Sequence, residues 1–232
     1  MNVRTLFVFL LITASLMFAD ENEGKKLVAL TFDDGPDTKL TSKVLDTLEE
    51  LNVVATFFVV GQRLNENTKA ILERMVSMGC EVENHSWNYE PLDSKGQETI
   101  REYIDRTNEL ILKYTGKKPR FFRPPNLAVS DVMFEVIDMP FIGGVLGFDW
   151  AGCDRDPGKI VNNILNGVKD GAIILLHDVQ PEPHPIVEVL RMLIPELRKR
   201  GYEFVTLEEL FRRKGVNPED PSYRGKMWVY VE

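Results

Sequence analysis

A short apolar run followed by an amphipathic segment recurs about seven times along this chain, and that alternation limits its fold more than any other feature. It favours a parallel sheet covered by helices. Because the chain lacks a Gly-rich phosphate loop, a barrel-like α/β fold is favoured over a dinucleotide-binding sheet. Strands are expected at residues 27–30, 53–60, 80–83, 141–148, 172–176 and 202–205, and helices at 41–51, 68–78, 97–114, 130–137 and 185–200, with others opening at Pro157 and Thr206.

The chain of 232 residues suits a single α/β domain, which we expect over residues 25–215. Residues 216–232 form a polar tail outside the repeat, in which residues 228–231 have the pattern of a small added strand. The net charge is -8, and no stripe of Lys or Arg is present. This balance argues against nucleic acid or an anionic membrane surface as a partner, and favours a neutral or cationic substrate.

The first nineteen residues have the layout of a secretory signal peptide. Arg4 precedes an apolar run over residues 6–18, and Ala19 leads into the polar residues 20–23. Cleavage would give a secreted or cell-envelope protein without a stable membrane partner, whereas an uncleaved segment would be an anchor. Cys80 and Cys153 match no metal spacing, and we expect Cys80 to pack as a small apolar residue, with a disulfide to Cys153 as the alternative.

Polar residues with catalytic chemistry follow the apolar runs. In a parallel barrel the strand ends converge on one mouth, so these residues should meet there. Two adjacent aspartates cannot both remain anions at close range without a cation or a strong donor, although the same Asp-Asp-Gly-Pro sequence also suits a simple turn. The residues are Asp33, Asp34, His85, Arg123, Asp149 and His177.

Residue types alone suggest a division of labour. Asp34 and His85 offer an oxygen and a nitrogen to a divalent metal, and Asp33 is suited to be the general base for a water on that metal. His177 can protonate a leaving group.

Four motifs occur in a fixed order, at residues 31–36, 85–87, 122–125 and 175–178. Together they resemble the polysaccharide deacetylases, the NodB homology domain of carbohydrate esterase family four, over about residues 26–213. The resemblance implies a distorted (β/α)7 barrel that uses zinc or cobalt to hydrolyse the carbon–nitrogen bond of N-acetyl groups, or O-acetyl esters, on an acetylated glycan such as peptidoglycan or chitin.

The resemblance also implies roles for individual residues. Asp33 would be the base, oriented by Arg123, and His177 the acid. Asp34 and His85 would bind the metal. Asp149 would partner His177 if Asp149-Trp150 is the family's Asp-Trp pair shifted by a gap; otherwise Asp149 is the first aspartate of that motif. The expected substrate contacts are Pro125, Asn126, which replaces the usual tyrosine, Trp150 and Leu175.

Tyr89 is the main departure from the family pattern, since the family has a second histidine there. Tyrosine, with a pKa near 10, is a poor neutral ligand, so the metal would be bound weakly unless Asn88 or His184 supplies the third ligand.

Two other functions compete with deacetylation: a catalytically impaired glycan-binding module, and a metal-independent hydrolase of a small cyclic amide. The retained base and acid argue against the first, and the Asp34–His85 pair argues against the second. The residues do not discriminate between glycans, between N- and O-acetyl groups, or between oligomeric states.

Overall fold

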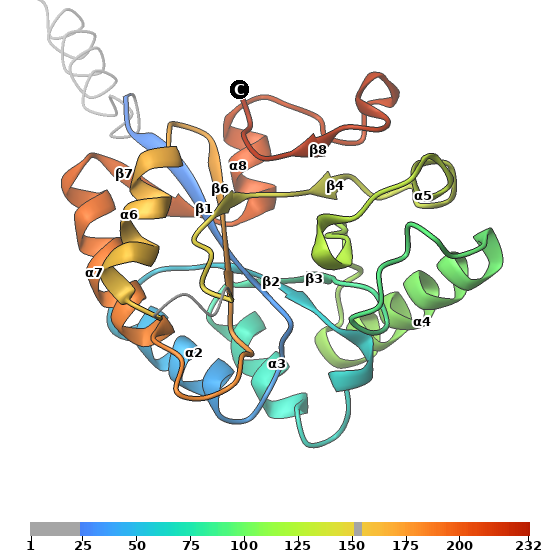
Figure 1. The fold of residues 1–232 in the computed structure, drawn as a ribbon, viewed down its shortest axis with the longest axis horizontal. Coiled ribbons are helices and arrows are strands. Elements are labelled where there is room, and N and C mark those ends of the chain that lie inside the picture. Colours follow the sequence, from blue (N-terminus) through green and yellow to red (C-terminus); the bar gives the residue numbers. More distant parts are fainter. Residues whose placement is uncertain (1–23, 151–154) are drawn as a thin grey trace, which may run out of the picture.

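The computed structural model describes residues 24–150 and 155–232, and its central element is the long strand β1 (Lys26–Asp33) (Figure 1). One edge of β1 pairs with β6 (Ala172–His177) along most of its length. The other edge is divided between β7 (Tyr202–Val205), which pairs with residues 26–29, and β2 (Thr56–Val59), which pairs with residues 31–33. This division splays the sheet and begins its curvature into a barrel.

Further parallel strands continue the sheet on both sides. β3 (Glu81–Asn84) pairs with β2, and β5 (Val145–Leu146) pairs with β6. A separate parallel pair, β4 (Phe141–Ile142) and β8 (Met227–Trp228), is linked to β3 by single bridges through Phe122. The expected α/β fold, a distorted barrel in a single domain, is confirmed.

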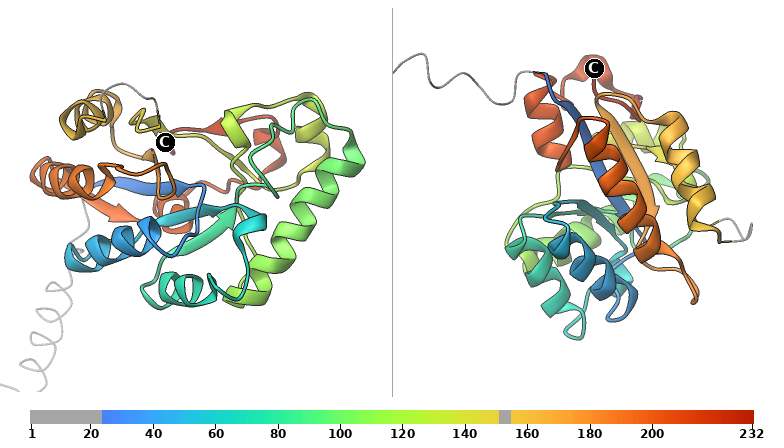
Figure 2. Two further views of the ribbon diagram at one scale, coloured as in Figure 1. Left: turned by 60° about the horizontal axis from the view of Figure 1, so that its bottom comes forward. Right: turned by 90° about the vertical axis from the view of Figure 1, so that its left-hand side faces the viewer.

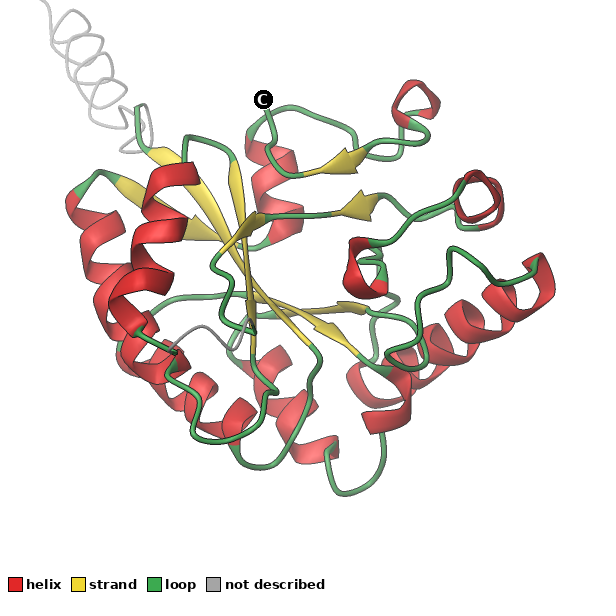
Figure 3. Cartoon of the chain, in the orientation of Figure 1, coloured by secondary structure: helices red, strands yellow, loops and turns green. Residues whose placement is uncertain are grey.

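Helices surround the sheet, as the repeated pattern predicted (Figures 2 and 3). Their ends carry the expected signals: Gly116 ends the longest helix with a φ of 73°, and the Thr206 side chain accepts a hydrogen bond from the backbone of Glu209. The helices are α2 (Leu40–Glu50), α3 (Lys69–Ser77), α4 (Gln97–Thr115), α5 (Asp131–Val136), α6 (Pro157–Gly167), α7 (Ile186–Lys199) and α8 (Leu207–Arg213), with short 3-10 turns at Gly61–Arg63, Pro125–Leu127 and Pro221–Tyr223.

The core lies on both faces of β1, which explains why its sequence is almost continuously apolar. Leu30 and Phe32 belong to a large cluster shared with α2 and α7, and Leu27 and Ala29 to a second cluster shared with α8. Burying each large apolar side chain contributes roughly 1.5–3 kcal/mol. Cys80 is a buried free thiol in the larger cluster.

The strand expected over residues 141–148 is instead two short strands in different sheets, a correction that has a steric cause. The chain between them lies directly on β6, where a Cβ on Gly144 would be 2.7 Å from the Leu175 Cβ. Gly143 and Gly144 therefore allow the chain to cross from β4 to β5, which no continuous strand with side chains could do.

The tail that was expected to lie outside the repeat packs into the barrel. Trp228 and Val231 are buried, and β8 pairs with β4. The expected signal peptide and Cys153 lie outside the described residues. Within residues 24–150 and 155–232, no helix has the length and apolar character needed to cross a membrane.

Candidate active site

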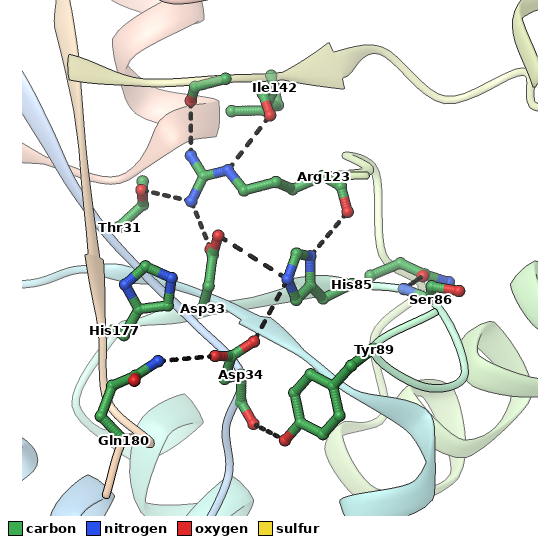
Figure 4. A network of polar contacts seen from close by, with 12 residues as sticks. Thr31, Asp33, Asp34, His85, Ser86, Tyr89, Arg123, Ile142, His177 and Gln180 are labelled. Carbon is green, nitrogen blue, oxygen red and sulfur yellow. Dashed lines mark hydrogen bonds and ion pairs between the residues drawn. The ribbon is translucent and has the colours of Figure 1, made fainter. Parts of the chain in front are cut away.

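Asp33 and His177 face each other across the last register pair of β1 and β6. Both strands are parallel, so the register places these residues at the same end of the barrel. Asp33 is 3% exposed. The sequence argument that strand ends converge is therefore correct for this pair, and Figure 4 shows the two side chains beside each other.

Arg123 fixes one oxygen of Asp33. Its Nη1 donates to Asp33 Oδ1 at 2.6 Å and to Thr31 Oγ1 at 2.8 Å, while Nη2 and Nε donate to the carbonyls of Gly143 and Ile142 at 2.7 and 3.2 Å. Complete burial lowers the pKa of Arg123, an effect that the charge and hydrogen bond of Asp33 oppose. The orientation of Asp33 thus rests on a guanidinium that is itself fixed by backbone.

His85 presents one ring nitrogen to the two aspartates. Its Nδ1 donates to the carbonyl of Arg123 at 2.8 Å, which leaves Nε2 3.6 Å from Asp34 Oδ1 and 3.9 Å from Asp33 Oδ2. Burial acts to lower the pKa of His85, but Asp33 and Asp34 raise it overall. Burial acts to raise the pKa of Asp34, but His85, His177 and Arg63 lower it overall.

The Asp34–His85 pair fits a divalent cation. Bonds of about 2.1 Å in a tetrahedral zinc site place two ligand atoms roughly 3.4 Å apart, and here Nε2 and Oδ1 are 3.6 Å apart. The second oxygen of Asp34 accepts a hydrogen bond from Gln180 at 3.2 Å, so Oδ1 is the oxygen that faces His85. Within the described residues, no group of three or more His, Cys, Asp or Glu is arranged to hold a metal ion.

The structure does not bring either proposed third ligand to this pair. Asn88 is absent from the cavity lining, and its Oδ1 accepts a hydrogen bond from the backbone of Glu90 at 3.0 Å. His184 Nε2 donates to the carbonyl of Asp149 at 3.2 Å. Tyr89 does line the cavity, and its hydroxyl donates to the Asp34 carbonyl at 3.3 Å while accepting from Arg63.

Asp149 binds His177 through both of its oxygens. Oδ1 lies 2.9 Å from His177 Nδ1, and Oδ2 accepts from the His177 backbone N–H at 2.8 Å. Burial acts to lower the pKa of His177. The hydrogen bond and charge of Asp149 outweigh burial, and the charges of Asp33 and Asp34 add to them, so that the pKa is raised to about 9. The ring is therefore protonated at neutral pH, as a general acid requires.

A cavity of about 590 Å³ is lined by Asp33, Asp34, His85 and His177, with Arg123 and Asp149 behind them. Every expected substrate contact lines it, namely Pro125, Asn126, Trp150 and Leu175. Sequence reasoning missed Thr31 and Gln180. The alternation of β1 placed Thr31 on the same face as Asp33 and could have identified it. Gln180 lies in the loop after β6, and no periodicity marked it.

The site combines a base, Asp33, and an acid, His177, on neighbouring strands, and a cation-binding pair lies beside them. This arrangement defines the class of the protein as a hydrolase built on a parallel (β/α) barrel. The polysaccharide deacetylase family model matches residues 20–138. The chain therefore belongs to the polysaccharide deacetylase family, and the resemblance drawn from its motifs is confirmed.

Relatives of known structure and sequence agree with this assignment. A family 4 acetyl xylan esterase from Clostridium thermocellum, solved with a cobalt ion, superposes with a TM-score of 0.85 at 53% identity, covering 89% of this chain and 99% of that one. A peptidoglycan-N-acetylglucosamine deacetylase of Bacillus cereus is 35% identical over 82% of this chain and 90% of its own length. A bifunctional xylanase/deacetylase of Pseudobutyrivibrio xylanivorans is 44% identical over 90% of this chain, which spans only 34% of that protein.

Proposed function

We propose that this protein is a metal-dependent deacetylase that hydrolyses acetyl groups on a polysaccharide. One observation carries the proposal: Asp33, held by Arg123, and His177, held by Asp149, are register partners on adjacent strands at one cavity. A protein that only bound glycans would have no use for a fixed base and a protonated acid at the same place.

The residues divide the reaction between them. Asp33 accepts the proton of the attacking water through Oδ2, because Oδ1 is occupied by Arg123. His177 then donates a proton to the departing sugar nitrogen or oxygen. Asn126 lines the cavity in a left-handed backbone conformation, and we assign its N–H to the acetyl carbonyl oxygen. A divalent cation held by Asp34 and His85 would supply Lewis-acid activation.

Acetylated xylan is the first substrate to assay. The acetyl xylan esterase is 53% identical to this chain, whereas the peptidoglycan deacetylase is 35% identical. N-acetylglucosamine oligomers are the second substrate, and they distinguish amide from ester hydrolysis.

Acetate release from both substrates, with and without a chelator and with Zn²⁺ or Co²⁺ restored, tests the proposal. We expect release from at least one substrate, loss of release on chelation, and recovery with metal. Binding of oligosaccharide without any release would favour the impaired glycan-binding module. Release that is insensitive to chelation would favour the metal-independent hydrolase.

We further propose that the protein acts outside the cytoplasm. The proposal rests on Arg4 and the apolar run over residues 6–18. Cell fractionation with mass analysis of the mature N-terminus tests it. A protein found in the cytoplasm with residues 1–19 intact would contradict it.

A further inference from the structure

His184 is a buried histidine to which the reaction described above assigns no role. It lies in the loop between β6 and α7, and its side chain is 1% exposed. Its Nε2 donates to the carbonyl of Asp149 at 3.2 Å and lies 3.8 Å from Asp149 Oδ2. His184 therefore contacts the same aspartate that holds the catalytic acid, His177.

Asp149 depends on the position of its backbone, because its side chain is short and both of its oxygens bind His177. The chain that leads to Asp149 is fixed at Gly147, whose carbonyl accepts a hydrogen bond from α6 at 3.1 Å. The next residue, Phe148, has a φ of 59°, an unfavourable conformation for a side chain of this size. A second contact beyond Phe148 fixes the segment on the other side of this residue, and His184 supplies it.

The loop that carries His184 is itself anchored at several points. The His184 backbone N–H donates to Glu182 Oε2 at 3.1 Å, and Glu182 in turn pairs with Lys43 of α2 at 3.0 Å. Arg155 Nη1 donates to two carbonyls of the same loop, among them that of Pro181 at 2.7 Å. These contacts fix the distance between the His184 ring and Asp149, as a positioning role requires.

The His184 ring is uncharged at neutral pH. Nε2 carries a proton because it faces a carbonyl, and Nδ1 is buried with no hydrogen-bond partner in the described part of the chain. Burial lowers the pKa of His184, and the charges of His177 and Arg155 lower it further, against the opposing effect of Asp149. A charged ring at this place would compete with His177 for the carboxylate. The uncharged ring holds Asp149 and leaves its charge to the acid.

We propose that His184 is a positioning residue for the catalytic acid: its Nε2–H holds the backbone of Asp149 where both carboxylate oxygens reach His177. The inference rests on the deacetylase function proposed above, and it adds a third residue to the His177–Asp149 pair. His184 is absent from the described lining of the catalytic cavity. Its loss should therefore alter the proton donor and leave substrate binding intact.

Two amides of different length test the contact. The nitrogen of a glutamine side chain reaches about as far as Nε2 of histidine, whereas that of asparagine reaches only as far as Nδ1. His184→Gln should keep the hydrogen bond to Asp149, and His184→Asn should lose it. Both replacements are uncharged, as the histidine is, so a change in the titration of His177 would report the position of Asp149 and not a change of charge.

NMR titration of the metal-free protein measures this effect. His177 should lose its proton at the wild-type pH in His184→Gln and at a lower pH in His184→Asn, because the carboxylate no longer holds the ring as closely. A role in folding alone would lower the melting temperature without moving the titration. His184→Leu, which fills the space but cannot donate, should match His184→Asn and replaces it if the asparagine variant does not fold. An unmoved His177 titration, or equal shifts in the glutamine and asparagine variants, would overturn the inference.

Kinetics separate this role from substrate binding. For His184→Asn we expect turnover on acetylated xylotetraose or N-acetylchitotetraose to fall about tenfold with an unchanged KM, because proton donation by His177 is impaired. The rate on 4-nitrophenyl acetate, whose leaving group needs no proton, should remain unchanged. A raised KM with unchanged turnover, or equal losses on both kinds of substrate, would overturn the inference. A wild type that released no acetate would overturn the deacetylase instead, and the NMR titration would still decide the role of His184.

Discussion

At the scale of single residues, Arg123 explains why Asp33 is poised as a base. The guanidinium is completely buried, and each of its nitrogens donates to an oxygen of Thr31, Asp33, Ile142 or Gly143. It therefore cannot rotate with the carboxylate it holds. This leaves Asp33 Oδ2, which faces His85, as the oxygen free to take a proton.

Asp33→Asn should abolish most acetate release without unfolding the protein. The amide keeps the shape of the carboxylate but cannot accept the proton, so we expect a loss of about 10²–10⁴-fold in turnover. Initial rates on acetylated xylan, together with the circular dichroism melting curve, measure both effects. Near-wild-type turnover in a folded variant would remove Asp33 from the mechanism.

Asp149→Asn should lower the pKa of His177 from about 9 toward the ordinary histidine value, because the negative charge that favours the protonated ring and strengthens its hydrogen bond is lost. Below that pKa the ring is charged, and above it the ring is neutral, so the variant should lose the proton at a lower pH. NMR titration of the metal-free protein measures this, since the chain has only three histidines to assign. His184→Gln serves as the assignment control, and an unchanged His177 titration in Asp149→Asn would contradict the prediction.

Tyr89→His should tighten metal binding by at least about tenfold, since a nitrogen donor would join Asp34 and His85 at a site that otherwise has two strong ligands. The structure supports this because Tyr89 lines the cavity and its hydroxyl bonds the Asp34 carbonyl. Isothermal titration with Zn²⁺ and Co²⁺ measures the affinity. Tyr89→Phe removes only the hydroxyl and is the control. Unchanged affinity in Tyr89→His combined with its loss in Asn88→Ala would show that Asn88 is the ligand.

At the scale of elements, the sequence predicted the features that depend on neighbouring residues, such as the ends of helices. The sequence indicated the long helix ending at Gly116 and the capping residue Thr206, and both occur. The division of residues 141–148 into two strands depends on how closely the chain approaches β6, which no periodicity reports. Periodicity also could not identify a third metal ligand. Asn88 is oriented by a hydrogen bond within its own turn, and His184 is oriented by the carbonyl of Asp149, which is distant in sequence.

Gly144→Ala tests this view of the β4–β5 crossing. The new Cβ would meet the Leu175 Cβ at 2.7 Å and the Ile173 carbonyl at 3.2 Å, which are rigid parts of β6. We expect a destabilisation of about 1–3 kcal/mol, which lowers the melting temperature by several degrees. Gly96→Ala, where no atom lies within 4 Å of the added Cβ, is the control. Equal melting temperatures in the two variants would show that the crossing is not sterically constrained.

At the scale of the whole molecule, the tail closes the barrel between β4 and β6. Gly143 N–H donates to the Trp228 carbonyl at 2.7 Å, and Ile173 N–H donates to the Val229 carbonyl at 3.0 Å. Val231 N–H then donates to the Gly171 carbonyl at 2.8 Å. A domain boundary at residue 215, which composition suggested, would therefore leave backbone groups of both strands unpaired.

The tail is also connected to the catalytic base. The N–H of Gly143 donates to the carbonyl of Trp228 in β8, and the carbonyl of Gly143 accepts a hydrogen bond from Arg123. Arg123 in turn donates to Asp33. Composition marked this tail as polar, but its two apolar anchors are buried, with Trp228 packed against Phe211 and Tyr223 at centroid distances of 5.0 and 4.8 Å.

Removing residues 227–232 should therefore lower both stability and activity. Trp228→Ala alone should cost about 3–5 kcal/mol in the free energy of unfolding, and the truncation should cost more because it also unpairs two strands. Urea unfolding measures the stability, and turnover on acetylated xylan at a temperature where the truncated chain is folded measures the effect on Asp33. Removal of Glu232 alone is the control, because it breaks only an exposed ion pair with Lys169 that contributes about 1 kcal/mol or less. If the truncated chain matched this control in both measurements, residues 227–232 would contribute neither to the stability of the barrel nor to the position of Asp33.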